Sequence, residues 1–584
     1  EIPRSDWSSD VCSSDLTSCE AALAEGAPAI HEKGNILSHE HLVRGNADEV
    51  LANSAFVVTE HYSVPINEHA FMEPECAIAQ PEGEGILLFS AGQSIYDEQR
   101  EVARMLGLDK EKIHVQSKLV GGGFGGKEDM SVQHHASLAA WLLKKPVKVL
   151  LSREESLMVH PKRHGMEMDF TTGCDEEGNL TAMKAVIYAD TGAYASLGGP
   201  VLQRACTHAA GPYKYQTIDV EGFAVYTNNP PAGAFRGFGV CQTAFAIESN
   251  LNLLAEKVGL SPWEIRFKNA VAPGDTLPNG QLVSKNAALK EALLAVKDVY
   301  EQAEVAGISS FFKNSGVGVG LPDTGRCIIS VEEGKIHVRT SAACIGQGMA
   351  TVTTQIACET LNLPPEMIVA EAPDTRRTPN SGTTTASRQS LFTGEATRRA
   401  AMQLRYELDM GRALSDLEGE EFYGEYSAKT DPLINDKKSP VSHAGYGYAA
   451  EVAILDDKGK VAKFVAAYDM GQVVNPRAAE GQIEGGIAMG MGYALTEKFA
   501  LEEGYVKAKY ATLGLVNATQ VPPIETILVH ADNLHEGLAY GIKGVGELAT
   551  IPTAPALAGA YFALDGQLRP SLPLENTPYQ KKKR

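Results

Sequence analysis

Six short segments place glycines or other small residues beside a side chain that can donate or accept hydrogen bonds. They are Gly121–Glu128 (GGGFGGKE), Ala234–Gly239 (AFRGFG), Ile345–Gly348 (IGQG), Thr383–Gln389 (TTTASRQ), Gly481–Gly486 (GQIEGG) and Gly544–Glu547 (GVGE). A glycine lets backbone N–H groups approach a ligand closely, and a glutamine offers both a donor and an acceptor. These segments predict loops that hold one large, polar, phosphorylated cofactor between two domains.

The first segment by itself leaves several interpretations open. A Walker A loop fits Gly121, Gly126 and Lys127, but Glu128 stands where that loop needs the Ser or Thr that binds Mg²⁺. A carboxylate at that point would repel phosphate groups. A tight turn without any ligand also fits, since glycines are frequent in turns.

A dinucleotide-binding fingerprint is the third interpretation of the same glycines. It fits Gly121, Gly123 and Gly126, and it would make the chain a nucleotide-binding dehydrogenase. The strand before such a loop should be apolar on both faces, however, and here Gln116 and Lys118 interrupt it. This interpretation would also leave the other five segments unexplained.

Composition limits the class of protein. A chain of 584 residues is too long for one core and implies at least two domains. Hydrophobic residues at 44% and charged residues at 21% are ordinary for a globular protein. A net charge of -21 argues against a nucleic-acid partner, and no apolar run is long enough to span a membrane.

The cysteine pattern bears on metal sites and cellular location, and the first sixteen residues differ in composition from the rest of the chain. Nine cysteines are scattered without a C-x-x-C pair, so neither a zinc site nor an iron–sulfur cluster is predicted, and scattered thiols suit the cytoplasm. Residues 1–16 repeat Ser-Asp and resemble translated adaptor DNA, so they are left out of the fold prediction. We interpret residues 17–50 as the remnant of a truncated N-terminal domain.

Hydrophobic periodicity predicts two successive α/β units, residues 51–275 and 276–584, with the cofactor between them. In the first unit we expect strands over 55–62, 186–194 and 220–226, a buried strand over 147–151, and helices over 131–145 and 242–258. In the second unit we expect strands over 336–340 and 367–370, helices over 350–361 and 394–408, and a hairpin of 445–455 with 461–468. The fold class is therefore mixed α/β.

Taken together and in this order, the six segments resemble the molybdenum-cofactor subunit of the xanthine dehydrogenase and aldehyde oxidase family, from about Ala55 onward. The segments 316–326 (GVGVGLPDTGR) and TTTASRQ, with the ending LPLENTPY, are most similar to the bacterial selenium-dependent xanthine dehydrogenases. The resemblance implies a molybdopterin, in its cytosine dinucleotide form, whose molybdenum is held by the pterin. No protein ligand cluster is then needed.

The resemblance also assigns roles to residues. It implies that Gln93, Phe124, Arg236 and Ala386 lie around the molybdenum, and that Gly123, Gly125, Gln347, Ser387, Gln389, Gln482 and Gly546 complete the cofactor cradle. Glu547 matches the family's catalytic glutamate. The family hydroxylates its substrates with oxygen from water, so Glu547 is expected to accept a proton in that reaction.

The resemblance further implies a purine substrate, such as xanthine or hypoxanthine. Glu128 and Arg204 stand where purine-oxidising members keep an acid and an arginine, and Phe238 offers an apolar face to the ring. The second phenylalanine of eukaryotic members is replaced here by the glycine-rich segment 316–320. Two alternatives remain: an aldehyde or another N-heterocycle as substrate, or Glu128 as a helix cap with Arg204 on the surface.

Electrons must leave the site after each turnover. Because this sequence has no cluster motif, we expect a 2Fe-2S domain and an FAD domain on partner chains or on a missing N-terminal part. The resemblance also allows selenium at the metal and implies an oligomer.

Overall fold

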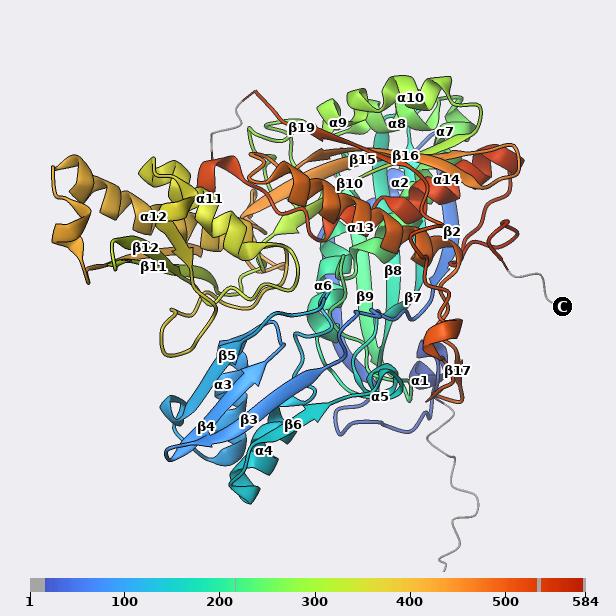
Figure 1. The fold of residues 1–584 in the computed structure, drawn as a ribbon. Helices are drawn as coiled ribbons and strands as arrows, with labels where there is room; N and C mark the ends of the chain where they lie inside the picture. The colour runs from blue at the N-terminus through green and yellow to red at the C-terminus, as the bar shows by residue number, and fades with distance from the viewer. Residues whose placement is uncertain (1–15, 216, 533–536, 581–584) are drawn as a thin grey trace, which may run out of the picture.

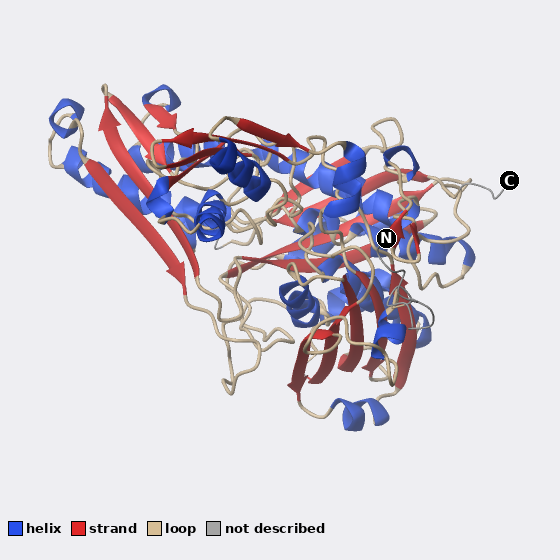
Figure 2. Ribbon diagram, turned by 90° about the horizontal axis from the view of Figure 1, so that it is seen from below, coloured by secondary structure: helices blue, strands red, loops and turns tan. Residues whose placement is uncertain are grey.

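The computed structural model describes residues 16–215, 217–532 and 537–580. The adaptor-like residues 1–15 lie outside this part. The described chain forms four main sheets with helices packed on them, which confirms the mixed α/β fold (Figures 1 and 2). Within these ranges, no helix is both long and apolar enough to cross a membrane.

The first sheet has five strands in the order β1-β9-β8-β7-β2. They are β1 (Ile36–Arg44), β9 (Thr217–Tyr226), β8 (Leu180–Gly192), β7 (Gly165–Cys174) and β2 (Phe56–Val64). Residues 17–50 thus supply an edge strand, β1, which pairs antiparallel with β9. Helices α6 (Gly198–His208) and α7 (Val240–Val258) pack on this sheet, and α7 is buried along almost its whole length.

The second sheet is smaller and has its own core, which it shares with α3 (Ile95–Leu106) and α4 (Gln133–Leu143). Its order is β5-β4-β3-β6, from strands Ile113–Ser117, Gly85–Ser90, Cys76–Glu82 and Val147–Leu150. The prediction of a buried strand at 147–151 is wrong in one respect. Strand β6 pairs only with β3 at the sheet edge, so alternate residues, such as Leu150, reach solvent.

The third sheet shares one continuous core with the first. Its order is β10-β15-β16-β19, from strands Ala306–Ser315, Gly445–Leu455, Val461–Asp469 and Ile524–Val529. The predicted hairpin of β15 and β16 is confirmed. Helices α9 (Leu289–Ala295), α13 (Pro476–Leu495) and α14 (Thr553–Asp565) pack around this sheet, and every residue of β10 is buried.

The fourth sheet forms a separate lobe with its own core, at the upper left of Figure 1. Its order is β13-β12-β11-β14, from strands Ile368–Ala370, Lys335–Arg339, Asp323–Glu332 and Glu421–Ala428. Helices α11 (Met349–Leu361) and α12 (Gln389–Asp409) cover it. The remaining helices and strands are short: α1 (Cys19–Leu23), α2 (Ala47–Ala52), α5 (Arg153–Val159), α8 (Pro262–Asn269), α10 (Lys297–Gln302), β17 (Leu501–Glu502) and β18 (Tyr505–Val506).

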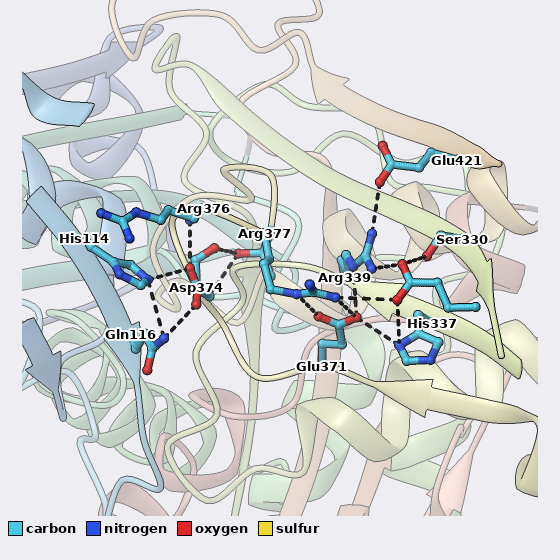
Figure 3. Close-up of polar contacts among 12 residues, drawn as sticks. His114, Gln116, Ser330, His337, Arg339, Glu371, Asp374, Arg376, Arg377 and Glu421 are labelled. Atoms are coloured by element: carbon cyan, nitrogen blue, oxygen red, sulfur yellow. Dashed lines mark hydrogen bonds and ion pairs between the residues drawn. The ribbon is translucent and has the colours of Figure 1, made fainter. Parts of the chain in front are cut away.

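A polar network joins the second sheet to the fourth (Figure 3). Asp374 accepts hydrogen bonds from Gln116 Nε2 at 2.8 Å and contacts His114 Nε2 at 2.9 Å, both from β5. Three residues away, Glu371 pairs with Arg377 at 2.8 Å and with Arg339 of β12 at 2.9 Å. The segment between these two acids therefore fixes the two small lobes relative to each other.

Candidate active site

A cavity of about 310 Å³ lies where these sheets meet. Thirteen of the fifteen residues predicted for the site line it: Gln93, Phe124, Gly125, Glu128, Arg236, Phe238, Gln347, Ala386, Ser387, Gln389, Gln482, Gly546 and Glu547. They come from the loops of the second sheet, the segments that precede α7, α11 and α12, the first residue of α12, the helix α13 and the loop before α14. The tertiary structure therefore gathers segments that are hundreds of residues apart into one wall.

Gln93 holds the glycine loop in place. Its Oε1 accepts hydrogen bonds from the backbone N–H groups of Gly125 at 3.2 Å and Lys127 at 3.3 Å, and its Nε2 donates to Thr384 O at 2.7 Å. A Cβ on Gly123 would lie 2.6 Å from Gln93 Oε1. Gly123 is not part of the cavity wall. Its glycine is needed so that the loop can pack on Gln93.

Lys127 turns away from the cavity. Its Nζ pairs with Glu73 Oε2 at 2.9 Å, and it lies 4.8 Å from the centre of the Phe71 ring. The side chain is therefore already used in a buried contact and cannot meet a phosphate in the cavity. This geometry argues against the Walker A interpretation of the loop.

Four cavity residues other than glycine have left-handed backbone conformations. The φ angles are 54° at Phe124, 48° at Phe238 and 47° at both Ala386 and Ser387. Such conformations are rare for these residue types and cost free energy, so they concentrate where function requires a particular geometry. All four lie in the predicted motifs.

Arg236 ties three parts of the wall together. Its Nε donates to Gly546 O, and its Nη2 donates to Gln482 O at 2.8 Å. Burial lowers the pKa of the Arg236 guanidinium to about 10. The side chain still carries its positive charge at neutral pH and brings one cation to the cavity.

The prediction that Gly481–Gly486 forms a loop is wrong. The segment lies inside α13, which Asn475 caps by accepting a hydrogen bond from Ala478 N at 3.1 Å. The glycine at 486 serves packing, because a Cβ there would lie 2.5 Å from the backbone of Ala549. Gln482 nevertheless lines the cavity, from the first turns of the helix.

The amides of Gln347 and Gln389 brace their own loops. Gln347 Oε1 accepts from Ile345 N at 2.7 Å and its Nε2 donates to Ala343 O at 3.1 Å. Gln389 Nε2 donates to Thr383 O at 3.1 Å, and α12 begins at this residue, five positions before the predicted start. Both glutamines therefore shape the cavity wall through the backbone they hold.

Glu547 is held mainly through one carboxylate oxygen. Ser387 Oγ donates to Glu547 Oε2 at 3.2 Å, and Glu547 N donates back to Ser387 Oγ at 3.1 Å. Lys313 Nζ, from β10, lies 3.4 Å from the same Oε2. Lys313 was not among the predicted residues, although a lysine in a strand that has no other charged residue was a signal that could have found it.

Glu128 faces the same cavity as Glu547. Burial raises the pKa of the Glu128 carboxyl well above its usual range, and the nearby carboxylates of Asp129 and Glu547 act in the same direction. This shift favours the neutral, protonated form of the Glu128 carboxyl, which can donate a hydrogen bond. The alternative that it caps a helix is wrong, because α4 begins only at Gln133.

Arg204 is only 2% exposed, so the alternative that places it on the surface is wrong. It does not line the cavity either. Its Nη1 contacts His443 Nε2 at 2.6 Å, and its Nη2 donates to Val317 O at 2.6 Å. Arg204 lies behind the wall in this structure, while its Nε has no hydrogen-bond partner among the described residues.

Three helices begin at the cavity. Met349, Gln389 and Asn475 all line it, and they stand at the starts of α11, α12 and α13. No side chain caps α11 or α12, so their first N–H groups remain available. Helix N-termini attract anions, and a Cβ on Gly346 would meet open space. The cavity therefore fits a polar ligand that carries phosphate.

The comparisons with known proteins agree with this geometry. Models of the molybdopterin cofactor-binding domain match residues 30–270 and, in two overlapping matches, residues 284–422 and 412–522. The chain is 34% identical over 591 residues to a probable xanthine dehydrogenase chain of Bacillus subtilis (strain 168), covering 93% of this chain and 79% of that one.

Two further relatives act on different substrates, according to their names. The nicotinate dehydrogenase large molybdopterin subunit of Eubacterium barkeri is 41% identical over 289 residues, which is 49% of this chain and 68% of that one. The aldehyde oxidoreductase structure from Desulfovibrio gigas superposes with a TM-score of 0.88 at 27% identity, over 96% of this chain and 65% of that chain.

Fold, cavity and matches together define a molybdopterin-binding oxidoreductase chain. It belongs to the xanthine dehydrogenase and aldehyde oxidoreductase family of molybdenum hydroxylases, as its motifs predicted. The interpretation of the Gly121 loop as the site of a nucleotide-dependent dehydrogenase is wrong.

Proposed function

We propose that this chain oxidises a purine, xanthine or hypoxanthine, by hydroxylation at the cavity, with Glu547 as the base. The observation that supports this most directly is the arrangement of the Glu547 carboxylate. Ser387 and Lys313 engage Oε2, and Oε1 has no partner among the described residues. A carboxylate held in this way can accept a proton from a group placed in the cavity.

The residues around the cavity fit the molybdopterin that the family implies. The residues that would hold it are Gln93, Phe124, Gly125, Arg236, Gln347, Ala386, Ser387, Gln389, Gln482 and Gly546. The uncapped starts of α11 and α12 would offer N–H groups to its phosphates. When bound, this cofactor supplies the metal that activates water and receives the substrate's electrons. The chain's own part is to orient the substrate and to move the proton.

Two residues that line the cavity suit a flat, polar ring as the substrate. The raised pKa of Glu128 favours its protonated carboxyl, which can donate to a ring nitrogen or an exocyclic oxygen. Phe238 lines the same cavity and offers an aromatic face. Another N-heterocycle is the second candidate, and the 41% identity to the nicotinate dehydrogenase chain favours it.

Other parts of the enzyme complete the proposal. We expect 2Fe-2S and FAD groups on partner chains or domains to carry the electrons away, and a cytosine dinucleotide form of the cofactor. The family resemblance also allows selenium at the metal. The eight cysteines of the described chain are all free thiols, which supports a cytoplasmic location.

A substrate panel tests the proposal. Protein purified from its own host is assayed for molybdenum and selenium and then for turnover of xanthine, hypoxanthine, nicotinate and benzaldehyde. We expect purines to be preferred. Glu128→Val combined with Arg204→Met should shift that preference toward aromatic aldehydes, because the variant loses the polar side chain on the cavity wall and the buried positive charge behind the wall. A protein with its full complement of molybdenum that oxidises benzaldehyde readily and purines not at all would contradict the proposal.

A further inference from the structure

Lys313 is a lysine in the interior of the protein. Its side chain is 1% exposed, near the end of β10. The Nζ atom lies 3.4 Å from Glu547 Oε2 and donates to Asn314 Oδ1 at 2.5 Å. Lysines are almost never buried to this extent unless they are paired. Within the described residues, Lys313 is the one cation within 4.0 Å of the Glu547 carboxylate.

The end of β10 is joined directly to both halves of the Glu547 site. Ser315 Oγ accepts a hydrogen bond from Gly544 N at 2.8 Å, three residues before Glu547. Gly316 N donates to Ala386 O at 3.0 Å, next to Ser387. The strand therefore fixes the position of Lys313 relative to the carboxylate and to the serine that holds it.

Other charged and titratable groups also face Glu547. Glu128 comes from the glycine loop and Arg204 from α6. Arg236 lies just before α7, and Cys241 lies in its first turn. Both arginines form their hydrogen bonds with other residues, Arg204 with His443 and Val317, and Arg236 with Gly546 and Gln482. Lys313 is thus the cation placed to act on this carboxylate.

We propose that Lys313 is a positioning residue for the catalytic base: its ammonium group holds Glu547 by Oε2 and supplies the positive charge that an ionised carboxylate needs inside the protein. This inference rests on the proposed function of Glu547. Lys313 does not line the cavity, so it acts through Glu547 and not on the substrate.

The charge balance of the pair supports this role. Burial lowers the pKa of the Lys313 ammonium to about 8, and the Glu547 carboxylate opposes that shift. The ammonium and the carboxylate thus lie as an opposite pair in a place where an unpaired charge is costly. Removing the ammonium leaves the Glu547 carboxylate without its nearest cation.

The first test compares pH profiles of kcat/KM for the holoenzyme. In Lys313→Met we expect kcat at pH 7 to fall at least about tenfold, and the acid limb to move up by about one pH unit, the low end for losing an opposite charge at this distance. Lys313→Arg should restore the limb. The matched control is Lys162→Met, which removes a buried lysine paired with Glu68 at 2.8 Å and should leave the limb unmoved.

A second readout does not depend on activity. The thermal midpoint is measured for wild type, Lys313→Met, Glu547→Gln and the double variant, with molybdenum content determined for each. We expect Lys313→Met to lower the thermal midpoint much less in the Glu547→Gln background than in the wild-type background. If the midpoint changes of the two single variants add up in the double variant, and the acid limb of Lys313→Met does not move, the proposed role of Lys313 is wrong but Glu547 can still be the base. Full turnover by Glu547→Gln would instead show that Glu547 is not the base.

Discussion

Ser387 and Glu547 form a reciprocal pair: the Ser387 hydroxyl donates to the carboxylate and accepts from the backbone N–H of the same glutamate. The two residues are 160 positions apart, and Ser387 adopts a left-handed backbone conformation to make this contact. The geometry fixes the rotamer of Glu547 before any ligand binds. Because the carboxylate is already in position, less conformational entropy is lost when a substrate binds beside it.

Glu547→Gln removes the base and keeps its shape. Turnover should fall at least about a hundredfold, the low end for the loss of a general base. Bound molybdenum should stay unchanged, because the amide still fills the site. The measurement pairs steady-state turnover with metal analysis of the same preparation, and near-normal turnover would show that another group is the base.

Alanine at Gln347 or Gln482 should weaken cofactor binding. Gln347 braces its loop through Ile345 and Ala343, and Gln482 lies beside Arg236 on the wall. Losing such hydrogen bonds next to a buried polar ligand should lower cofactor affinity by about tenfold. Bound molybdenum and pterin are measured after purification.

The control for these variants is Gln403→Ala, since Gln403 lies exposed on α12, away from the cavity, and bonds to Arg399 O on the same helix and to Tyr423 O of β14. It should keep full occupancy. If both cavity variants also keep full occupancy, the two glutamines serve only the protein's own structure.

Glu128→Gln should change how stability depends on pH. The pKa of Glu128 is raised in the folded state, so above the ordinary carboxyl pKa of 4.5 the unfolded chain loses a proton that the folded chain keeps. The unfolding free energy of the wild type then falls by up to about 1.4 kcal/mol per pH unit relative to the variant, until the folded pKa is reached. Denaturant unfolding at several pH values measures this. If the unfolding free energies of the two proteins change with pH in parallel, the pKa of Glu128 is not raised in the folded state.

Two neighbouring glycines of α13 should respond in opposite directions to alanine. A Cβ at Gly486 would lie 2.5 Å from Ala549, so Gly486→Ala should push α13 away from the segment after Glu547 and reduce both stability and turnover. A Cβ at Gly485 meets nothing within 4 Å, so Gly485→Ala should stabilise the helix by up to about 1 kcal/mol. Thermal unfolding and turnover of both variants check this, and equal effects would be evidence against the close packing.

The motifs located most of the site because their residues have few other uses. Five glycines in six positions, or a glutamine between two glycines, cost stability that a packed core would not accept, and this made GGGFGGKE and IGQG recognisable. The loop prediction was wrong for Gly481–Gly486, because glycine there serves helix packing. GQIEGG has the composition of a loop, yet its last glycine lets α13 approach Ala549.

The sequence by itself determined the family, the mixed α/β class and thirteen residues of the cavity wall, because these depend on local composition and on motifs in a fixed order. Only the tertiary structure decided which partners the charged side chains around the cavity face. Lys127 turns to Glu73 and Arg204 to His443, while Lys313 reaches Glu547 across 234 positions, since these contacts arise from sheet packing between distant segments and leave no periodic trace in the chain. Charge pairing in a buried site is a property of three-dimensional distance, which a linear sequence does not contain.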